Sequence, residues 1–111
     1  MALFKDQPMP KRIDFGSINA AALHNLRIIL QRFLPGGVVR HGEYIVRNPR
    51  RADRHAGSFR VNIRSGRWAD FAVGDAGGDP ISLIAYLQDI SQTDAALALA
   101  RMLNVEAYIH G

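Results

Sequence analysis

Apolar residues near the start of the chain recur at three- and four-residue spacing, which is the period of one helix face. This stretch covers residues 18–34, and Ser17 before it is a residue type suited to cap a first helical turn. Pro35-Gly36-Gly37 follows directly, and such a triplet ends a helix. The pattern predicts one N-terminal helix.

The same period returns in the last third of the chain. Asp79-Pro80 is typical of a helix start, and the spacing after it predicts a helix over residues 80–89. Ser91 opens a sequence similar to a capping box and predicts a last helix over residues 92–103.

Three segments between these helices have the short, alternating pattern of β-strands, namely residues 43–47 (EYIVR), 58–63 (SFRVNI) and 67–73 (RWADFAV). Ser65-Gly66 predicts a tight hairpin, and residues 48–57 have almost nothing to bury and predict an exposed loop. The predicted fold is therefore α+β: a small three-stranded antiparallel sheet with one N-terminal helix and two C-terminal helices.

Composition narrows the class of protein. The chain has 111 residues, of which 48% are hydrophobic, and we expect a flexible arm over residues 1–16 and a single domain over 17–111. It has no cysteine, which excludes disulfides, thiolate metal sites and a cysteine nucleophile. It also has no apolar run of membrane-spanning length and no signal-peptide pattern at its start. We expect a soluble, cytoplasmic domain.

Charge is unevenly distributed along the chain. The formal net charge is +4, but residues 40–67 alone contain eight arginines against Glu43 and Asp53, whereas residues 68–111 are acidic. Arginine forms two-pronged hydrogen bonds to phosphate and stacks on flat rings. The block therefore favours a nucleic-acid partner. A merely solvated arginine-rich surface is the alternative.

The candidate binding residues share a position in or beside the predicted strands, where arginines and aromatic rings could hold a single strand. They are Arg47, Arg50, Arg51, Arg54, Arg60, Arg64, Arg67 and Trp68. Alternation predicts Arg60 and Arg64 on the open face of the sheet. Trp68 suits either the core or an exposed stacking platform.

Catalytic patterns are weak in this sequence. The four histidines are scattered, and no nucleophile, zinc-protease or phosphate-loop motif occurs. Asp70, Asp75 and Asp79 leave open a small metal-dependent nuclease, although Asp79 is already explained as a helix cap. We expect no catalysis by this chain and no cofactor.

Four segments together resemble a known module: residues 48–51 (NPRR), 57–61 (GSFRV), 66–71 (GRWADF) and 74–79 (GDAGGD). They are similar to the N-terminal zinc-ribbon module of bacterial-type DNA primases and of phage and plasmid primase–helicase proteins. In that family a Cys-Pro-x-His pair precedes a Ser-Phe-x-Val strand, and a Cys-x-x-Cys turn precedes Gly-x-Gly-Gly-Asp. With the two C-terminal helices that follow, the resemblance spans residues 42–103, just over half of the chain.

The resemblance places the four zinc ligands of the family on Asn48, Arg51, Phe71 and Gly74, none of which is a credible zinc ligand. It therefore implies a metal-free ribbon. Phe71 and Trp68 are expected to fill the former metal region with apolar packing.

Family membership would imply a template-binding role in DNA replication, without catalysis. The expected partner is single-stranded DNA or RNA, together with a replication helicase or a primase catalytic domain. An adaptor or inhibitor that docks such a protein is the alternative from another class.

Overall fold

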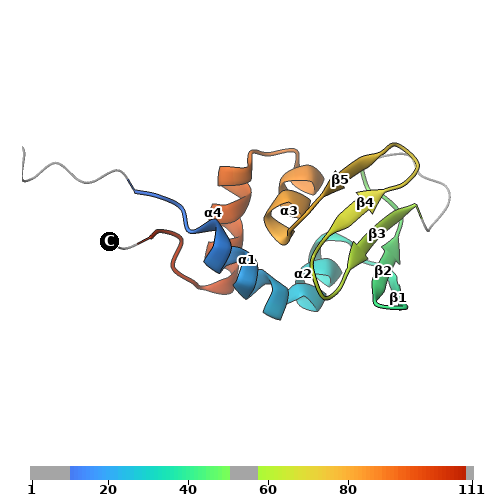
Figure 1. The fold of residues 1–111 in the computed structure, drawn as a ribbon, viewed down its shortest axis with the longest axis horizontal. Helices are drawn as coiled ribbons and strands as arrows, with labels where there is room; N and C mark the ends of the chain where they lie inside the picture. Colours follow the sequence, from blue (N-terminus) through green and yellow to red (C-terminus); the bar gives the residue numbers. More distant parts are fainter. Residues whose placement is uncertain (1–10, 51–57, 110–111) are drawn as a thin grey trace, which may run out of the picture.

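The computed structural model describes residues 11–50 and 58–109. In these two stretches the chain forms an α+β fold with four helices and one open, five-stranded antiparallel sheet (Figure 1). The elements in chain order are α1 (Phe15–His24), α2 (Leu26–Phe33), β1 (Val38–Arg40), β2 (Glu43–Val46), β3 (Phe59–Asn62), β4 (Trp68–Asp70), β5 (Asp75–Gly77), α3 (Pro80–Gln88) and α4 (Gln92–Leu103). The α+β class is confirmed, but a three-stranded sheet is wrong.

The predicted helix over residues 18–34 is two helices, α1 and α2, separated at Asn25. The side chain of Asn25 donates from Nδ2 to the carbonyl of Ala21 at 2.8 Å, and its backbone N–H bonds to Ala22 at 3.1 Å. Such local bonds compete with the regular helical ladder. The helix also begins earlier than predicted, because Asp14 rather than Ser17 caps it, with Oδ1 accepting from the N–H of Ser17 at 3.1 Å.

Residues 12–14 are tied to the end of the chain, although they fall in the expected arm. Asp14 N–H donates to the carbonyl of Ala107 at 2.9 Å, and Ile109 N–H donates to that of Arg12 at 2.8 Å. Ile13 and Tyr108 form the antiparallel bridge between these two bonds. The expectation of a flexible arm over residues 1–16 is therefore wrong for residues 12–14. Residues 1–10 lie outside the described stretches.

The sheet has the strand order β1-β2-β3-β4-β5, and every neighbouring pair is antiparallel. The three predicted strands are its centre. The last of them ends at Asp70 rather than Val73, because the Asp70 carbonyl accepts the N–H of Gly74 at 2.8 Å and closes a turn. Gly74 has φ of 82°, a conformation that favours glycine.

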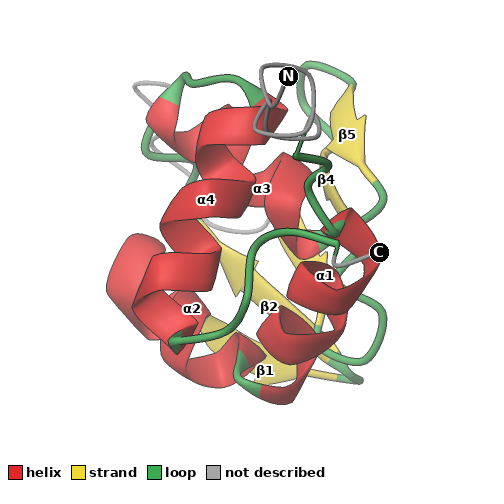
Figure 2. Ribbon diagram, turned by 90° about the vertical axis from the view of Figure 1, so that its left-hand side faces the viewer, coloured by secondary structure: helices red, strands yellow, loops and turns green. Residues whose placement is uncertain are grey.

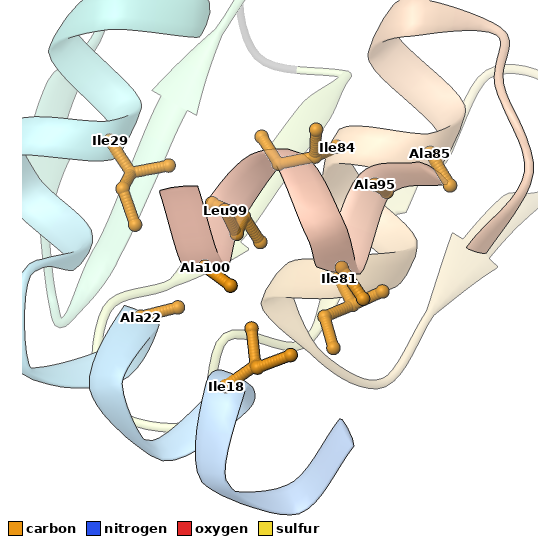
Figure 3. Packing of buried hydrophobic residues seen from close by; sticks show 10 residues of the cluster. Ile18, Ala22, Ile29, Ile81, Ile84, Ala85, Ala95, Leu99 and Ala100 are labelled. Carbon is orange, nitrogen blue, oxygen red and sulfur yellow. The ribbon is translucent and has the colours of Figure 1, made fainter. Parts of the chain in front are cut away.

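Helices α2 and α3 pack on one face of the sheet, and α1 and α4 pack against these two helices and each other; Figure 2 shows the helices in front of the strands. Two apolar clusters result. The first joins the helices, with Ile18, Ile29, Ile84 and Leu99 among its buried members (Figure 3). The second lies between the sheet and helices α2 and α3 and comprises Leu26, Leu30, Leu34, Tyr44, Val46, Phe59, Val61, Trp68 and Leu83.

The two C-terminal helices form where the sequence predicts them. Asp79 accepts from Ser82 N–H at 2.8 Å and precedes Pro80 at the start of α3. Ser91 accepts from Asp94 N–H at 3.0 Å at the start of α4. Across the described parts of the chain, no helix is both long and apolar enough to cross a membrane.

Candidate nucleic-acid interface

The open face of the sheet carries Glu43 and Arg60 among its strand residues, whereas the two aspartates of β4 and β5 lie on the helix-covered face. Successive strand residues alternate between faces, so Asp70 and Asp75, which are register partners, share the helix-covered face with Phe59. Arg60 lies on the other face, paired with Ile45 on one side and Ala69 on the other. The open face thus has an arginine at its centre, while the carboxylates of β4 and β5 lie behind it.

A hollow of about 520 Å³ lies on this open face. Ala69 and Ala76, which are register partners, form a floor of small side chains. Arg60 and Phe71 line one part of the rim. The other lining residues are Glu43, Asn62, Ser65, Arg67, Trp68, Gly77 and Gly78. We name this feature the open-face hollow.

Arg60 and Phe71 form the best-defined pair at the open-face hollow. The guanidinium carbon of Arg60 lies 6.0 Å from the centroid of the Phe71 ring, within the range of a cation–π contact. Phe71 is 70% exposed, and its backbone N–H is fixed to the carbonyl of Ser58 at 2.8 Å. An exposed aromatic ring and a guanidinium therefore lie together at the open-face hollow.

Trp68 lies in the core, with 6% of its surface exposed. Its ring centroid is 5.8 Å from that of Phe59 and 4.7 Å from that of Tyr86. Its Nε1 donates to Ser82 Oγ at 2.9 Å. The expectation of an exposed stacking platform at Trp68 is therefore wrong, and the exposed ring at this site is that of Phe71.

Strand alternation contains the signal that identifies Phe71. Positions 68 and 71 differ by an odd number, so residues there cannot both face the core in one regular strand. The resemblance to the zinc ribbon nevertheless implies that both rings are inside, in the former metal region. The side chain of Trp68 has the larger apolar surface and an N–H that finds a partner on α3, and it takes the inner position.

The other predicted arginines are dispersed around the sheet. Arg67 lines the open-face hollow, whereas Arg64 lies in the turn after β3 and lines a second hollow with Arg27 and His41. The prediction that Arg64 lies on the open face of a strand is wrong, because β3 ends at Asn62. The Oδ1 of Asn62 accepts the N–H of Arg64 at 2.9 Å. Arg47 is exposed just after β2.

Arg50 is engaged in intramolecular contacts. Its Nη2 lies 3.5 Å from Asp89 Oδ1, and its guanidinium carbon lies 4.8 Å from the centroid of Tyr86. These contacts set Arg50 apart from the hollow. Arg51 and Arg54 lie outside the described residues, so their predicted role stays a prediction.

Hydrogen-bonded polar side chains surround Asn48, one of the positions at which the resemblance would place a metal ligand. Asn48 is buried and donates from Nδ2 to Asp70 Oδ2 and to the Tyr86 hydroxyl, both at 2.8 Å. Its Oδ1 accepts the N–H of Arg50 at 2.8 Å. The Tyr86 hydroxyl donates in turn to Asp75 Oδ2 at 2.9 Å. The expectation that Phe71 and Trp68 fill this region is wrong for Phe71, which is exposed.

We call Asn48, Asp70, Tyr86 and Asp75 the polar network. Burial raises the pKa of Tyr86 above its ordinary value; the hydrogen bond from Asn48 lowers this pKa, and the bond to Asp75 raises it. The phenol therefore stays protonated near neutral pH and can donate to Asp75. In the part of the chain that is described, every buried side-chain nitrogen or oxygen has a hydrogen-bond partner.

The acidic residues do not assemble into a metal site. Asp70 accepts from Asn48 and from Ala72 N–H at 2.9 Å, and Asp79 caps α3. Within residues 11–50 and 58–109, no three histidine, aspartate or glutamate side chains lie together in a group that could hold a metal ion.

Comparison of the chain with protein-family models, with curated proteins and with solved structures gives no match.

Proposed function

We propose that this chain binds single-stranded nucleic acid on the open face of its sheet and acts as a non-catalytic module of a replication protein. The observation that supports this most directly is the Arg60–Phe71 pair at the rim of the open-face hollow. A ring and a guanidinium provide two planar surfaces for unpaired bases. Arg67 adds a charge for a phosphate on the same surface.

The shape of the open-face hollow supports a single strand rather than a duplex. Its floor consists of Ala69 and Ala76, which leave room over the strand backbone for a flat ring. A paired base hides its faces inside the stack, whereas an unpaired base can lie on Phe71. We therefore expect single strands to bind more tightly than duplexes of the same length.

The replication context rests on the resemblance of residues 42–103 to the primase zinc-ribbon module. That resemblance places Asn48, Arg51, Phe71 and Gly74 where the family has zinc ligands, and none of these residues is a credible zinc ligand. In this proposal the polar network takes over the structural role of the metal. The ribbon-like fold, the cytoplasmic location and a helicase or primase partner stay predictions.

A salt titration tests the proposed function. Two phosphate contacts, from Arg60 and Arg67, predict a slope of about −1.4 in a plot of log K against log salt concentration, and each further arginine that contacts a phosphate adds about −0.7. Fluorescence anisotropy with a labelled oligothymidylate, measured between about 50 and 200 mM salt, gives this slope. Absence of binding at the lowest salt concentration would disprove the proposal. The same titration with an oligouridylate distinguishes DNA from RNA.

Phe71→Ala is expected to weaken oligonucleotide binding about tenfold, because stacking of one base on an aromatic ring contributes about 1–3 kcal/mol. The fold should be unaffected, since Phe71 is 70% exposed. Ile28→Ala is the matched control, because Ile28 is also a large exposed apolar residue but lies on α2. Equal affinities for the two variants would exclude Phe71 from the interface.

A further inference from the structure

Strand β1 leaves one edge of the sheet open. It pairs with β2 on one side, and no other described strand lies on its outer side (Figure 1). Val38 and Val39, which point to opposite faces, are 53% and 43% exposed. Exposed apolar edge strands are templates for pairing with another chain, and proteins usually protect them.

The start of β1 is held in place by its neighbour on β2. The Tyr44 hydroxyl donates to the carbonyl of Leu34 and accepts the N–H of Gly37 at 3.1 Å. The edge is therefore a fixed surface, which reduces the entropy that a ligand must lose on pairing with it.

The surroundings of this edge are basic. Beside Val39 lies a hollow of about 280 Å³ that is lined by Arg27 and Gln31 of α2 and by Tyr44. Arg40 ends the strand and is exposed. Among residues 11–50 and 58–109, neither Arg27 nor Arg40 forms an ion pair. The edge thus combines unpaired backbone groups, two valines and two arginines, of which Arg40 lies opposite Glu43 of β2 and Arg27 lies on α2.

We propose that the outer edge of β1 binds an extended acidic segment of a partner protein, which adds to the sheet as a sixth strand. Backbone hydrogen bonds would supply affinity, and alternating side chains would supply specificity. Every second side chain of the partner segment would pack along Val38. The side chains between them would lie over Val39, where an acidic side chain can reach Arg27.

Charge and shape favour an acidic polypeptide at this edge over a second copy of the chain or a nucleic-acid strand. Two copies of the chain each carry a formal charge of +4 and repel each other. A nucleic-acid strand would find aliphatic valines and not a ring on which to stack. An acidic polypeptide matches the charge, the valines and the open backbone together.

Binding of a synthetic peptide tests the proposal. The probe is a short labelled peptide of alternating valine and glutamate, added to the full chain and followed by fluorescence anisotropy. We expect it to bind, and we expect a valine–lysine peptide and an N-methylated valine–glutamate peptide to bind at least about tenfold more weakly. Amide hydrogen exchange should slow at residues 38–40, because a new strand protects the outer groups of β1.

Arg27→Glu is expected to weaken binding of the valine–glutamate peptide about tenfold. Arg32→Glu is the matched control, since it makes the same charge change on α2 but does not line the hollow beside Val39. Equal effects of the two variants would overturn the proposal, as would undiminished binding of the N-methylated peptide. Dimerisation in the absence of peptide would assign the edge to a second copy of the chain. Weaker oligonucleotide binding by Arg27→Glu, but not by Arg32→Glu, would assign the edge to nucleic acid.

Discussion

Replacing Arg60 and Arg67 together by glutamate is expected to weaken oligonucleotide binding about a hundredfold at low salt, which corresponds to about 2.7 kcal/mol. Both side chains line the open-face hollow, so the double variant removes two cations and places two anions on the binding surface. The salt dependence should also become shallower, by about 0.7 in slope for each lost phosphate contact. Anisotropy titrations at several salt concentrations measure both effects.

The control for this prediction must change the net charge by the same amount. Arg32→Glu with Arg101→Glu does so on α2 and α4, and neither residue lines the open-face hollow. A weakening caused only by net charge would be the same in both double variants. Such equality would contradict a localised interface, whereas an effect confined to the Arg60 and Arg67 variant would support it.

Asn48→Ala is expected to lower the free energy of unfolding by about 3 kcal/mol. Asn48 donates to both Asp70 and Tyr86 and accepts from the backbone of Arg50, and its side chain is buried. Without it, the buried Asp70 carboxylate loses a donor that water cannot replace. Urea unfolding followed by circular dichroism measures the change.

Asn62→Ala is the matched control for the polar network. Asn62 also accepts backbone hydrogen bonds, from Arg64 and Ser65, but it is exposed and water can replace its side chain. We expect a loss below about 1 kcal/mol for this variant. If Asn48→Ala were equally mild, the polar network would not have the structural importance that its burial indicates.

The elements that the sequence predicts correctly depend on local signals. Helices α3 and α4 begin at Asp79 and Ser91, whose side chains bond the backbone within their own first turn. Such caps are visible in any short window of sequence. Strands β2 and β3 have clear alternation, with Tyr44, Val46, Phe59 and Val61 all buried.

The elements that the sequence misses depend on tertiary context. Strand β1 has no buried residue and β5 is the segment Asp75-Ala76-Gly77, so neither has a period that could distinguish it from a loop. Residues 38–40 and 75–77 are strands only because they pair with β2 and β4, respectively. The division of the first helix depends likewise on one asparagine side chain that bonds back to Ala21.

For the candidate interface, the sequence predicts the positions of two arginines, Arg60 and Arg67, but not the position of the aromatic residue that accompanies them. Arg60 and Arg67 do line one hollow, because strand alternation fixes the side of Arg60. The inner position of Trp68 depends on partners far along the chain, at Ser82 and Tyr86. No local pattern specifies those contacts, so the exposed position of Phe71 emerges only in the folded protein.

Helix α3 contributes to both apolar clusters, with Leu83 facing the sheet and Ile81 and Ile84 facing the other helices. If the sheet unfolded, Leu83 would lose its apolar neighbours. If α1 and α4 unfolded, Ile81 and Ile84 would lose theirs. Neither half can therefore melt without exposing part of the same helix to water. The layers form a single cooperative unit, and a ligand held on the strands raises the melting temperature of the helices as well.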